Sequence, residues 1–238
     1  MKHLILFMLA LMILAAPLTG VLAEETRGFD TSEACAQAVV NALIQMNMVV
    51  FLDCYAIPEV ARQYNFEAVL GKYRLLTIGN MLLPPTSNVN VCCNEARLTN
   101  DLAIRVFGSA FTLENSEAAR LWGIVLKMED RSVEDMTALV SRNDALTLLE
   151  FQRFTDPSEL NEKYVKIMEQ RIDWCCTMYN TQAWEETVAV LGYKEQTVYL
   201  PLALVQYNGK WLAMPVQPIA SLLYGVPSFS LLITKDML

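Results

Sequence analysis

The chain has 238 residues, a formal net charge of −8 and 54% hydrophobic residues. It can bury a large core, and general disorder is excluded. Without the first 23 residues it keeps 17 basic and 26 acidic residues, a net charge of −9. This balance repels phosphate backbones and no cluster of Lys and Arg offsets it, so nucleic-acid binding is not expected.

Residues 1–23 have the three regions of a secretory signal peptide. Met1-Lys2-His3 is a short positive segment, Leu4 to Ala16 is an unbroken apolar run, and Val21-Leu22-Ala23 forms a cleavage site. The apolar run is shorter than the about 20 residues that cross a bilayer. No cysteine near the site could carry a lipid anchor. We expect cleavage after Ala23, a secreted or extracytoplasmic protein, and no later membrane span.

Histidine is missing after the signal peptide, because the single histidine of the chain is His3. Nucleophiles activated by histidine and histidine metal ligands are therefore excluded. An enzyme would have to use carboxylates, Lys, Tyr or Cys. The sequence spells no catalytic motif, so we expect neither an enzyme nor a cofactor, although missing motifs alone do not decide the question.

The first third predicts helices. Asp30 is expected to be an N-cap, with Glu33 at N3 in a variant of the capping box. An apolar stripe of helical spacing follows, blurs at 45–47 and resumes up to Cys54, which predicts a helical hairpin. Pro58 suits the first turn of a third helix that reaches Gly71.

Residues 83–88 contain two adjacent prolines and break the pattern. We expect one α+β domain over residues 24–238, with a possible internal boundary near 84–90. Helical spacing returns over 98–106 and 121–128, and Ser132 with Asp135 opens a short helix. Asp156-Pro157-Ser158-Glu159 is a start signal for a helix that runs towards Cys175-Cys176.

The C-terminal quarter predicts a β-hairpin, because Asn208-Gly209 separates two apolar runs. A type I′ turn would pair Tyr207 with Lys210, Val205 with Leu212 and Leu204 with Ala213. Both faces of the ribbon are apolar, so helices or further strands should cover it. The predicted fold is a helix-rich α+β body with a C-terminal antiparallel β-hairpin, about 198–216, docked on it.

The two ends of the chain carry a family resemblance. Residues Phe29-Asp30-Thr31-Ser32-Glu33-Ala34 and the strand end Tyr207-Asn208-Gly209-Lys210-Trp211 resemble exported NTF2-like (cystatin-like) domains of Gram-positive bacteria. The resemblance implies an N-terminal helical pair packed on a curved antiparallel sheet. The long helical middle, about 93–180, departs from the family's compact pattern. The family contains enzymes and binding modules, so the resemblance implies no single function.

Six cysteines follow the signal peptide: Cys35, Cys54, Cys92, Cys93, Cys175 and Cys176. No Cys-x-x-Cys occurs, so neither a thioredoxin-type motif nor a zinc knuckle is present. Structural disulfides and buried free thiols are both open. If the first helix reverses at 45–47, Cys35 and Cys54 lie similarly far from the turn, which makes a disulfide between them possible.

A soft-metal site is a remote alternative. Cys175, Cys176 and Met178 offer two thiolates and a thioether, which favour Cu(I). Cys92 and Cys93 alongside them would complete a four-sulfur site. Packing in the core is the ordinary alternative for such residues, and we expect no bound metal.

Paired acids are the other candidates for chemistry. Glu129-Asp130 and Glu134-Asp135 could act in acid–base catalysis or hold Ca²⁺, and Glu185-Glu186 lies beside Trp184. The alternative is a solvated turn whose acids favour a helix start.

Aromatic residues concentrate in the last third of the chain. Most of them should be core, and a minority could line a ligand cleft. Those residues are Trp174, Tyr179, Trp184, Tyr193, Tyr199, Tyr207 and Trp211.

The sequence therefore predicts a secreted, non-catalytic binding protein for a small ligand, a peptide or a cell-envelope partner. The alternatives are a carboxylate-based extracytoplasmic hydrolase and, more remotely, a copper-handling protein. A convergent acidic pair in an aromatic pocket would favour the hydrolase. A shallow apolar patch without buried acids would favour the binding protein.

Overall fold

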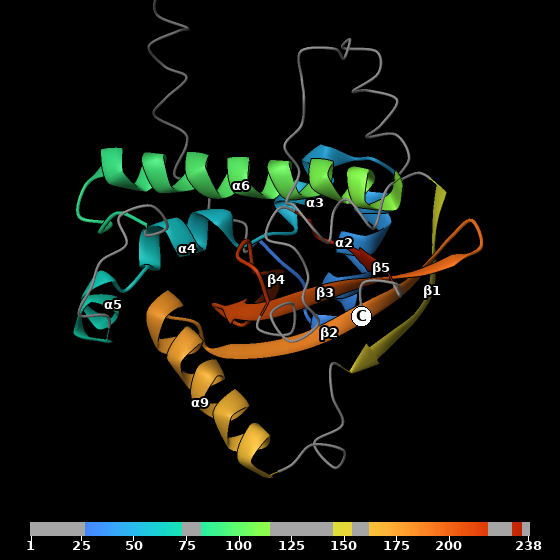
Figure 1. Cartoon of the computed structure of the whole chain (residues 1–238). Helices are drawn as coiled ribbons and strands as arrows, with labels where there is room; N and C mark the ends of the chain where they lie inside the picture. Colours follow the sequence, from blue (N-terminus) through green and yellow to red (C-terminus); the bar gives the residue numbers. More distant parts are fainter. Residues whose placement is uncertain (1–26, 73–81, 115–144, 154–161, 219–229, 235–238) are drawn as a thin grey trace, which may run out of the picture.

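The computed structural model describes residues 27–72, 82–114, 145–153, 162–218 and 230–234 (Figure 1). The helices are α2 (Ser32–Ile44), α3 (Met48–Asp53), α4 (Ile57–Gln63), α5 (Phe66–Lys72), α6 (Asn88–Glu114) and α9 (Glu162–Tyr179). The strands are β1 (Leu146–Arg153), β2 (Ala183–Tyr193), β3 (Gln196–Tyr207), β4 (Lys210–Ala213) and β5 (Ile233–Thr234). The α+β class is confirmed. In these ranges no helix is both long enough and apolar enough to cross a membrane.

Helix α2 begins one residue later than predicted. Thr31, not Asp30, is the N-cap, and its hydroxyl accepts a hydrogen bond from the Ala34 N–H at 3.1 Å. Asp30 instead accepts a hydrogen bond from the Lys210 ammonium at 2.5 Å, and this contact lowers the pKa of its carboxyl. The prediction was wrong because the sequence does not show that β4 brings a lysine to Asp30.

The helical hairpin reverses where the sequence predicted. Helix α2 ends at Ile44, Met46 has a positive φ of 53°, and Asn47 caps α3 by accepting from the Val50 N–H.

Asn94 on α6 fixes the segment that precedes α6. Its side-chain oxygen accepts a hydrogen bond from the Leu83 N–H at 2.7 Å, and its side-chain NH₂ donates to the Leu83 carbonyl at 2.8 Å.

The third predicted helix is two helices. Pro58 lies in the first turn of α4, as predicted, but α4 ends at Gln63. Asn65 caps α5 by accepting from the Ala68 N–H, while its own N–H donates to the Met178 carbonyl on α9 at 2.8 Å. This contact with a distant helix explains the break, which local spacing could not predict.

The predicted hairpin forms with the predicted register. Val205 lies opposite Leu212, and Asn208 and Gly209 have φ values of 51° and 77°, as a type I′ turn requires. The sheet is larger than predicted: it is antiparallel in the order β1-β2-β3-β4, with β5 also paired to β3. Strands β1 and β2 were not predicted.

The N-terminal segments close the β4 edge of the sheet. Phe29 exchanges two backbone hydrogen bonds with Trp211, and Ala213 bonds the backbone on either side of Tyr55. Gly28 has a φ of 107°, and a Cβ there would lie 2.8 Å from the Trp211 carbonyl oxygen, so this close approach requires glycine. Helix α2 lies against the sheet, and α6 runs along one side of the molecule (Figure 1).

Some predicted elements lie outside the described residues. These are the helical segments over 121–128 and 132–135, and the helix start at Asp156 to Glu159. The later part of that helix is described as α9, and the spacing over 98–106 belongs to α6. The single domain over 24–238 and its possible boundary near 84–90 stay predictions.

Candidate functional site

The structure distributes the cysteines over three places. Cys92 and Cys93 are exposed on α6, Cys175 and Cys176 are half-buried on α9, and Met178 in the same α9 turn packs against the core. Within the described ranges, no three Cys, His or acidic side chains come together as metal ligands. The described residues thus do not assemble the four-sulfur site.

Cys35 and Cys54 lie in the same buried core and carry free thiols. Burial raises the pKa of both, that of Cys54 to about 11, and the charge of Cys54 further raises the pKa of Cys35. The thiols are therefore protonated at neutral pH and are weak nucleophiles. The disulfide between them stays a prediction.

The predicted acidic pairs do not build a catalytic centre in the described residues. Glu129-Asp130 and Glu134-Asp135 lie outside those residues. Glu185 and Glu186 are neighbours on a strand and point to opposite faces.

Two other acids share one arginine. Arg27 lies 3.9 Å from both Asp53 and Glu59. The arginine compensates the charge of this pair, whereas hydrolysis by two carboxylates needs an acid and a base in separate environments.

The aromatic residues of the last third contribute mainly to the core. Tyr179 lies between Tyr64 and Trp184, with ring centroids 6.0 and 6.4 Å away. The buried hydroxyl of Tyr207 donates to the Tyr179 carbonyl at 2.7 Å. Burial, followed by the charge of Glu59, raises the pKa of Tyr207. This packed cluster joins α4, α9 and the sheet.

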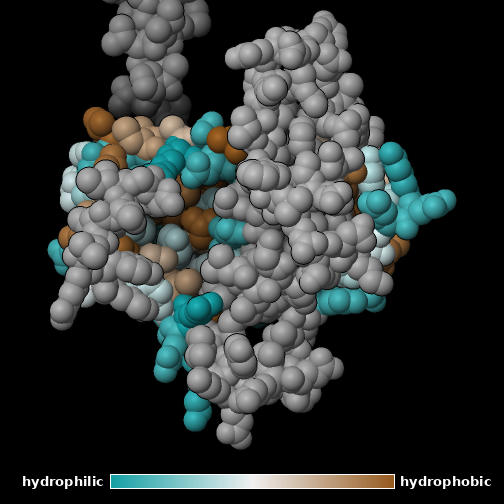
Figure 2. All heavy atoms as spheres, viewed as in Figure 1, coloured by the Kyte–Doolittle hydropathy of each residue, from teal (hydrophilic) through white to brown (hydrophobic). Residues whose placement is uncertain are grey.

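The surface of α6 offers an open place for a partner. Asn88, Val89, Cys92, Cys93 and Ala96 line a depression of about 390 Å³, which we call the α6 depression. All five residues are uncharged, and Val89 is 71% exposed. Hydrophobic atoms are visible along the start of this helix (Figure 2).

The exposed face of α6 extends beyond the depression. Ile104 is 49% exposed and continues the face, because positions 89, 93, 96, 100 and 104 follow the spacing of one helix side. The helical spacing over 98–106 predicts a helix here but not the side that stays uncovered, since an apolar helical stripe ordinarily indicates core.

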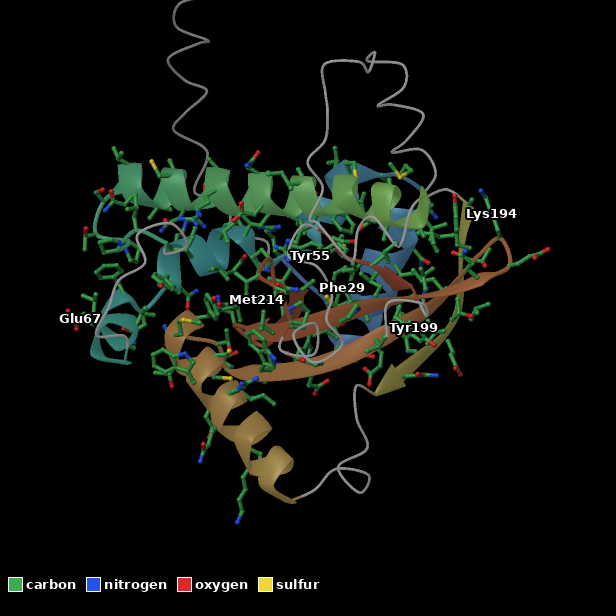
Figure 3. All side chains as sticks on the ribbon, viewed as in Figure 1. Phe29, Tyr55, Glu67, Lys194, Tyr199 and Met214 are labelled. Carbon is green, nitrogen blue, oxygen red and sulfur yellow. The ribbon has the colours of Figure 1, made fainter. Side chains whose placement is uncertain are left out.

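The interior next to α6 contains a second group of polar side chains. Arg105 and Tyr55 are only 7% and 2% exposed, and Tyr55 lies between α6 and the sheet (Figure 3). Burial lowers the pKa of Arg105, and Tyr55 has the largest opposing effect on it. Arg105 falls within the helical spacing over 98–106, which does not indicate that it is buried. A charged residue beside the apolar positions 98, 102 and 106 was the available signal.

Comparison with known proteins adds only a weak structural likeness. No protein-family model matches the chain, and no curated protein matches it. Among solved structures, the chain is similar to a cystatin-like protein from Ruminococcus gnavus ATCC 29149, with 15% sequence identity and a TM-score of 0.47. The alignment covers 85% of this chain but 44% of the other, so this chain spans less than half of that protein. The likeness is a weak resemblance.

Proposed function

We propose that this chain is an exported, non-catalytic binding protein, and that the α6 depression binds an apolar, uncharged segment of a peptide or cell-envelope partner. The observation that carries the proposal is the uncovered apolar face of α6, on which Val89 is 71% exposed. Exposed apolar patches rimmed by polar residues mark interaction sites. Export is inferred from the signal peptide at residues 1–23.

The charge of the depression supports this class of partner. Its lining contains no Lys, Arg, Asp or Glu, so an ionic partner would lose hydration there without gaining an opposite charge. The chain without residues 1–23 has a net charge of −9, which further disfavours acidic partners. An apolar, uncharged segment loses little on desolvation and gains by burial of Val89 and Ala96.

A non-catalytic role is supported by the side chains that could act as acids, bases or nucleophiles. The chain has no histidine after His3, and Asp53 and Glu59 share the positive charge of Arg27. The carboxylate-based hydrolase is the alternative, and turnover of a substrate distinguishes it from binding.

The experiment uses the chain without its signal peptide and three labelled peptides of equal length: apolar and uncharged, acidic, and basic. Fluorescence anisotropy should show saturable binding of the uncharged peptide alone. Val89→Asp should weaken this binding by at least about tenfold, because it buries an unpaired charge. Val49→Asp is the matched control, since Val49 is 72% exposed on α3, and it should bind like the wild type.

Two results would contradict the proposal. The first is equal binding of the uncharged peptide by wild type and Val89→Asp. The second is hydrolysis of a chromogenic ester, glycoside or peptide substrate that is lost in Glu59→Gln, which would establish the hydrolase instead.

A further inference from the structure

Two exposed thiols lie in the middle of the α6 depression. Cys92 and Cys93 are both exposed, and the lining continues to Val89 before them and to Ala96 after them. Positions 89, 92, 93 and 96 follow the spacing of one helix face. The other four cysteines of the chain are buried or half-buried, in the core or on α9. The depression is therefore the place where this chain presents thiols to its surroundings.

A bond between these two thiols would require α6 to unwind. Both residues lie inside the helix, Asn88–Glu114, and both thiols are free. Adjacent residues have Cα atoms about 3.8 Å apart, which is below the usual range of about 4.4–6.8 Å for a disulfide. Successive side chains of a helix also diverge by about 100°. The helix therefore keeps Cys92 and Cys93 apart as two separate thiols.

The chain offers no third cysteine to this pair. All six cysteines that follow the signal peptide are described, and Cys35 and Cys54 lie in the core while Cys175 and Cys176 lie on α9. In the described ranges, no group of three Cys, His, Asp or Glu side chains could hold a metal there. A sulfur partner must come from outside the chain. The export that we propose leads to a compartment in which thiols are ordinarily oxidised.

We propose that Cys92 and Cys93 are a thiol modification site, at which a small-molecule disulfide forms a mixed disulfide that closes the α6 depression. This rests on the proposed function, because it concerns regulation of the same depression. A cysteine thiolate attacks one sulfur of the disulfide R–S–S–R, so a Cys–S–S–R bond forms and the S–S bond of the reagent breaks. The cysteine sulfur is oxidised, and the leaving R–S⁻ is reduced and takes up the proton that the cysteine released.

The neighbouring thiol should not remove this modification. In many redox sites a second cysteine attacks a mixed disulfide and releases the attached group. In α6 that attack would create the bond between adjacent residues that the helix disfavours. The mixed disulfide should therefore persist until an external thiol reduces it, and the depression should open and close with the redox state of the surroundings.

The lining indicates which disulfides fit. It contains no Lys, Arg, Asp or Glu, so a charged substituent would lose hydration without gaining an opposite charge. A small aliphatic substituent without charge gains instead by burial against Val89 and Ala96. The chemical class that we assign to the site is thus the disulfide of a small uncharged thiol.

The test treats the folded chain without its signal peptide with bis(2-hydroxyethyl) disulfide, stops the exchange with acid and measures peptide masses. Trypsin releases residues 75–97, whose cysteines are Cys92 and Cys93, and residues 172–194, whose cysteines are Cys175 and Cys176. The first peptide should gain one or two hydroxyethylthio groups. The second peptide is the matched control, because its Cys-Cys pair also lies on a helix but is half-buried, and it should react at least about tenfold more slowly.

Fluorescence anisotropy with the uncharged peptide measures whether the modification closes the depression. The Kd of the modified protein should rise about tenfold, because the attached group occupies the lining and brings a hydroxyl without a partner into the interface. A reducing thiol should restore the binding. The variant Cys92→Ser with Cys93→Ser, whatever its own Kd, should show the same Kd before and after treatment. The variant Cys175→Ser with Cys176→Ser should respond like the wild type.

Several results would overturn the proposal. One is an unmodified 75–97 peptide in the wild type. Another is a 75–97 peptide that loses two hydrogen atoms and gains no group, which would be a bond between the adjacent cysteines. A covalent dimer through these cysteines, or an adduct that leaves the Kd unchanged, would also contradict it. If the reduced wild type does not bind the peptide, the proposed function fails, and the mass of residues 75–97 still decides whether the modification site exists.

Discussion

The buried thiol of Cys54 should make the reduced protein sensitive to alkaline pH. Burial raises the pKa of Cys54 from 9.0 to about 11; the charge of Asp53 adds to the rise, and that of Arg27 opposes it. Below pH 9 the thiol is protonated in both the folded and the unfolded state. Between pH 9 and 11 it ionises in the unfolded state alone, so the unfolded state binds fewer protons. The free energy of unfolding therefore falls by about 1.4 kcal/mol per pH unit in this window.

Urea unfolding of reduced wild type and Cys54→Ala from pH 8 to 10.5 measures this effect, because other titrating groups cancel in the difference. At pH 8 the wild type should be more stable by about 1 kcal/mol, since alanine leaves the volume of the sulfur unfilled. This advantage should shrink by about 2 kcal/mol by pH 10.5 and change sign. Cys92→Ala removes an exposed thiol and should keep the wild-type pH dependence. A difference between wild type and Cys54→Ala that stays constant over this range would refute the reasoning.

Oxidation gives the same experiment a second arm. With oxidised glutathione as the oxidant, Cys35 and Cys54 each lose a hydrogen atom and form the predicted disulfide, while glutathione is reduced to two thiols. Apart from mixed disulfides at Cys92 or Cys93, the oxidised protein should weigh two hydrogen atoms less and should lose the alkaline sensitivity described above, because no Cys54 thiol remains to ionise. If both thiols still react with an alkylating reagent after oxidation and unfolding, the two cysteines are core residues and the disulfide prediction is wrong.

Three further substitutions test the packing. Gly28→Ala should lower the free energy of unfolding by about 1–3 kcal/mol, because Gly28 has a positive φ and the new Cβ would meet the β4 backbone. Gly71→Ala is the control, since nothing lies within 4 Å of its new Cβ. It should be neutral or stabilising by up to about 1 kcal/mol. Tyr207→Phe should cost about 1–3 kcal/mol in thermal unfolding, because it leaves a buried α9 carbonyl without its donor, whereas Tyr199→Phe should change stability by less than about 0.5 kcal/mol. Asn94→Ala should lower the free energy of unfolding in urea by about 2 kcal/mol, since two short hydrogen bonds to the segment before α6 are lost. An unchanged urea midpoint would contradict the role of Asn94 in fixing this segment.

The predictable part of the fold is the part set by local chemistry. The type I′ turn at Asn208-Gly209 fixes its own register, so the pairing of Val205 with Leu212 follows from the sequence alone. The reversal at 45–47 was predictable for a similar reason, since Asn47 caps the second helix. In both cases the residues that decide the structure lie within a few positions of one another.

The missed elements depend on distant partners. Strand β1 has the sequence LTLLEFQR, in which the alternation of apolar and polar residues is interrupted at Leu148-Leu149. The spacing alone therefore does not separate strand from helix. Strand β2 places two glutamates next to Trp184. Which of its side chains are buried becomes clear only from its pairing with β3. The break between α4 and α5 depends on a hydrogen bond from Asn65 to a carbonyl on α9. Local spacing contains no information about these contacts.

Two residues of α6 break the sequence pattern in opposite directions. Val89 is an apolar residue left on the surface, and Arg105 is a charged residue placed in the interior, on one helix. Such local inconsistencies are expected at functional sites, where stability is given up for binding. Arg105 donates to the Pro215 carbonyl and so connects α6 to the end of β4. Arg105→Met tests whether this bond or the cost of burying the charge decides the stability of the protein. Since the bond connects two distant segments, we expect Arg105→Met to lower the free energy of unfolding measured in urea, and a neutral or stabilising effect would show instead that burial of the charge costs more than the bond contributes.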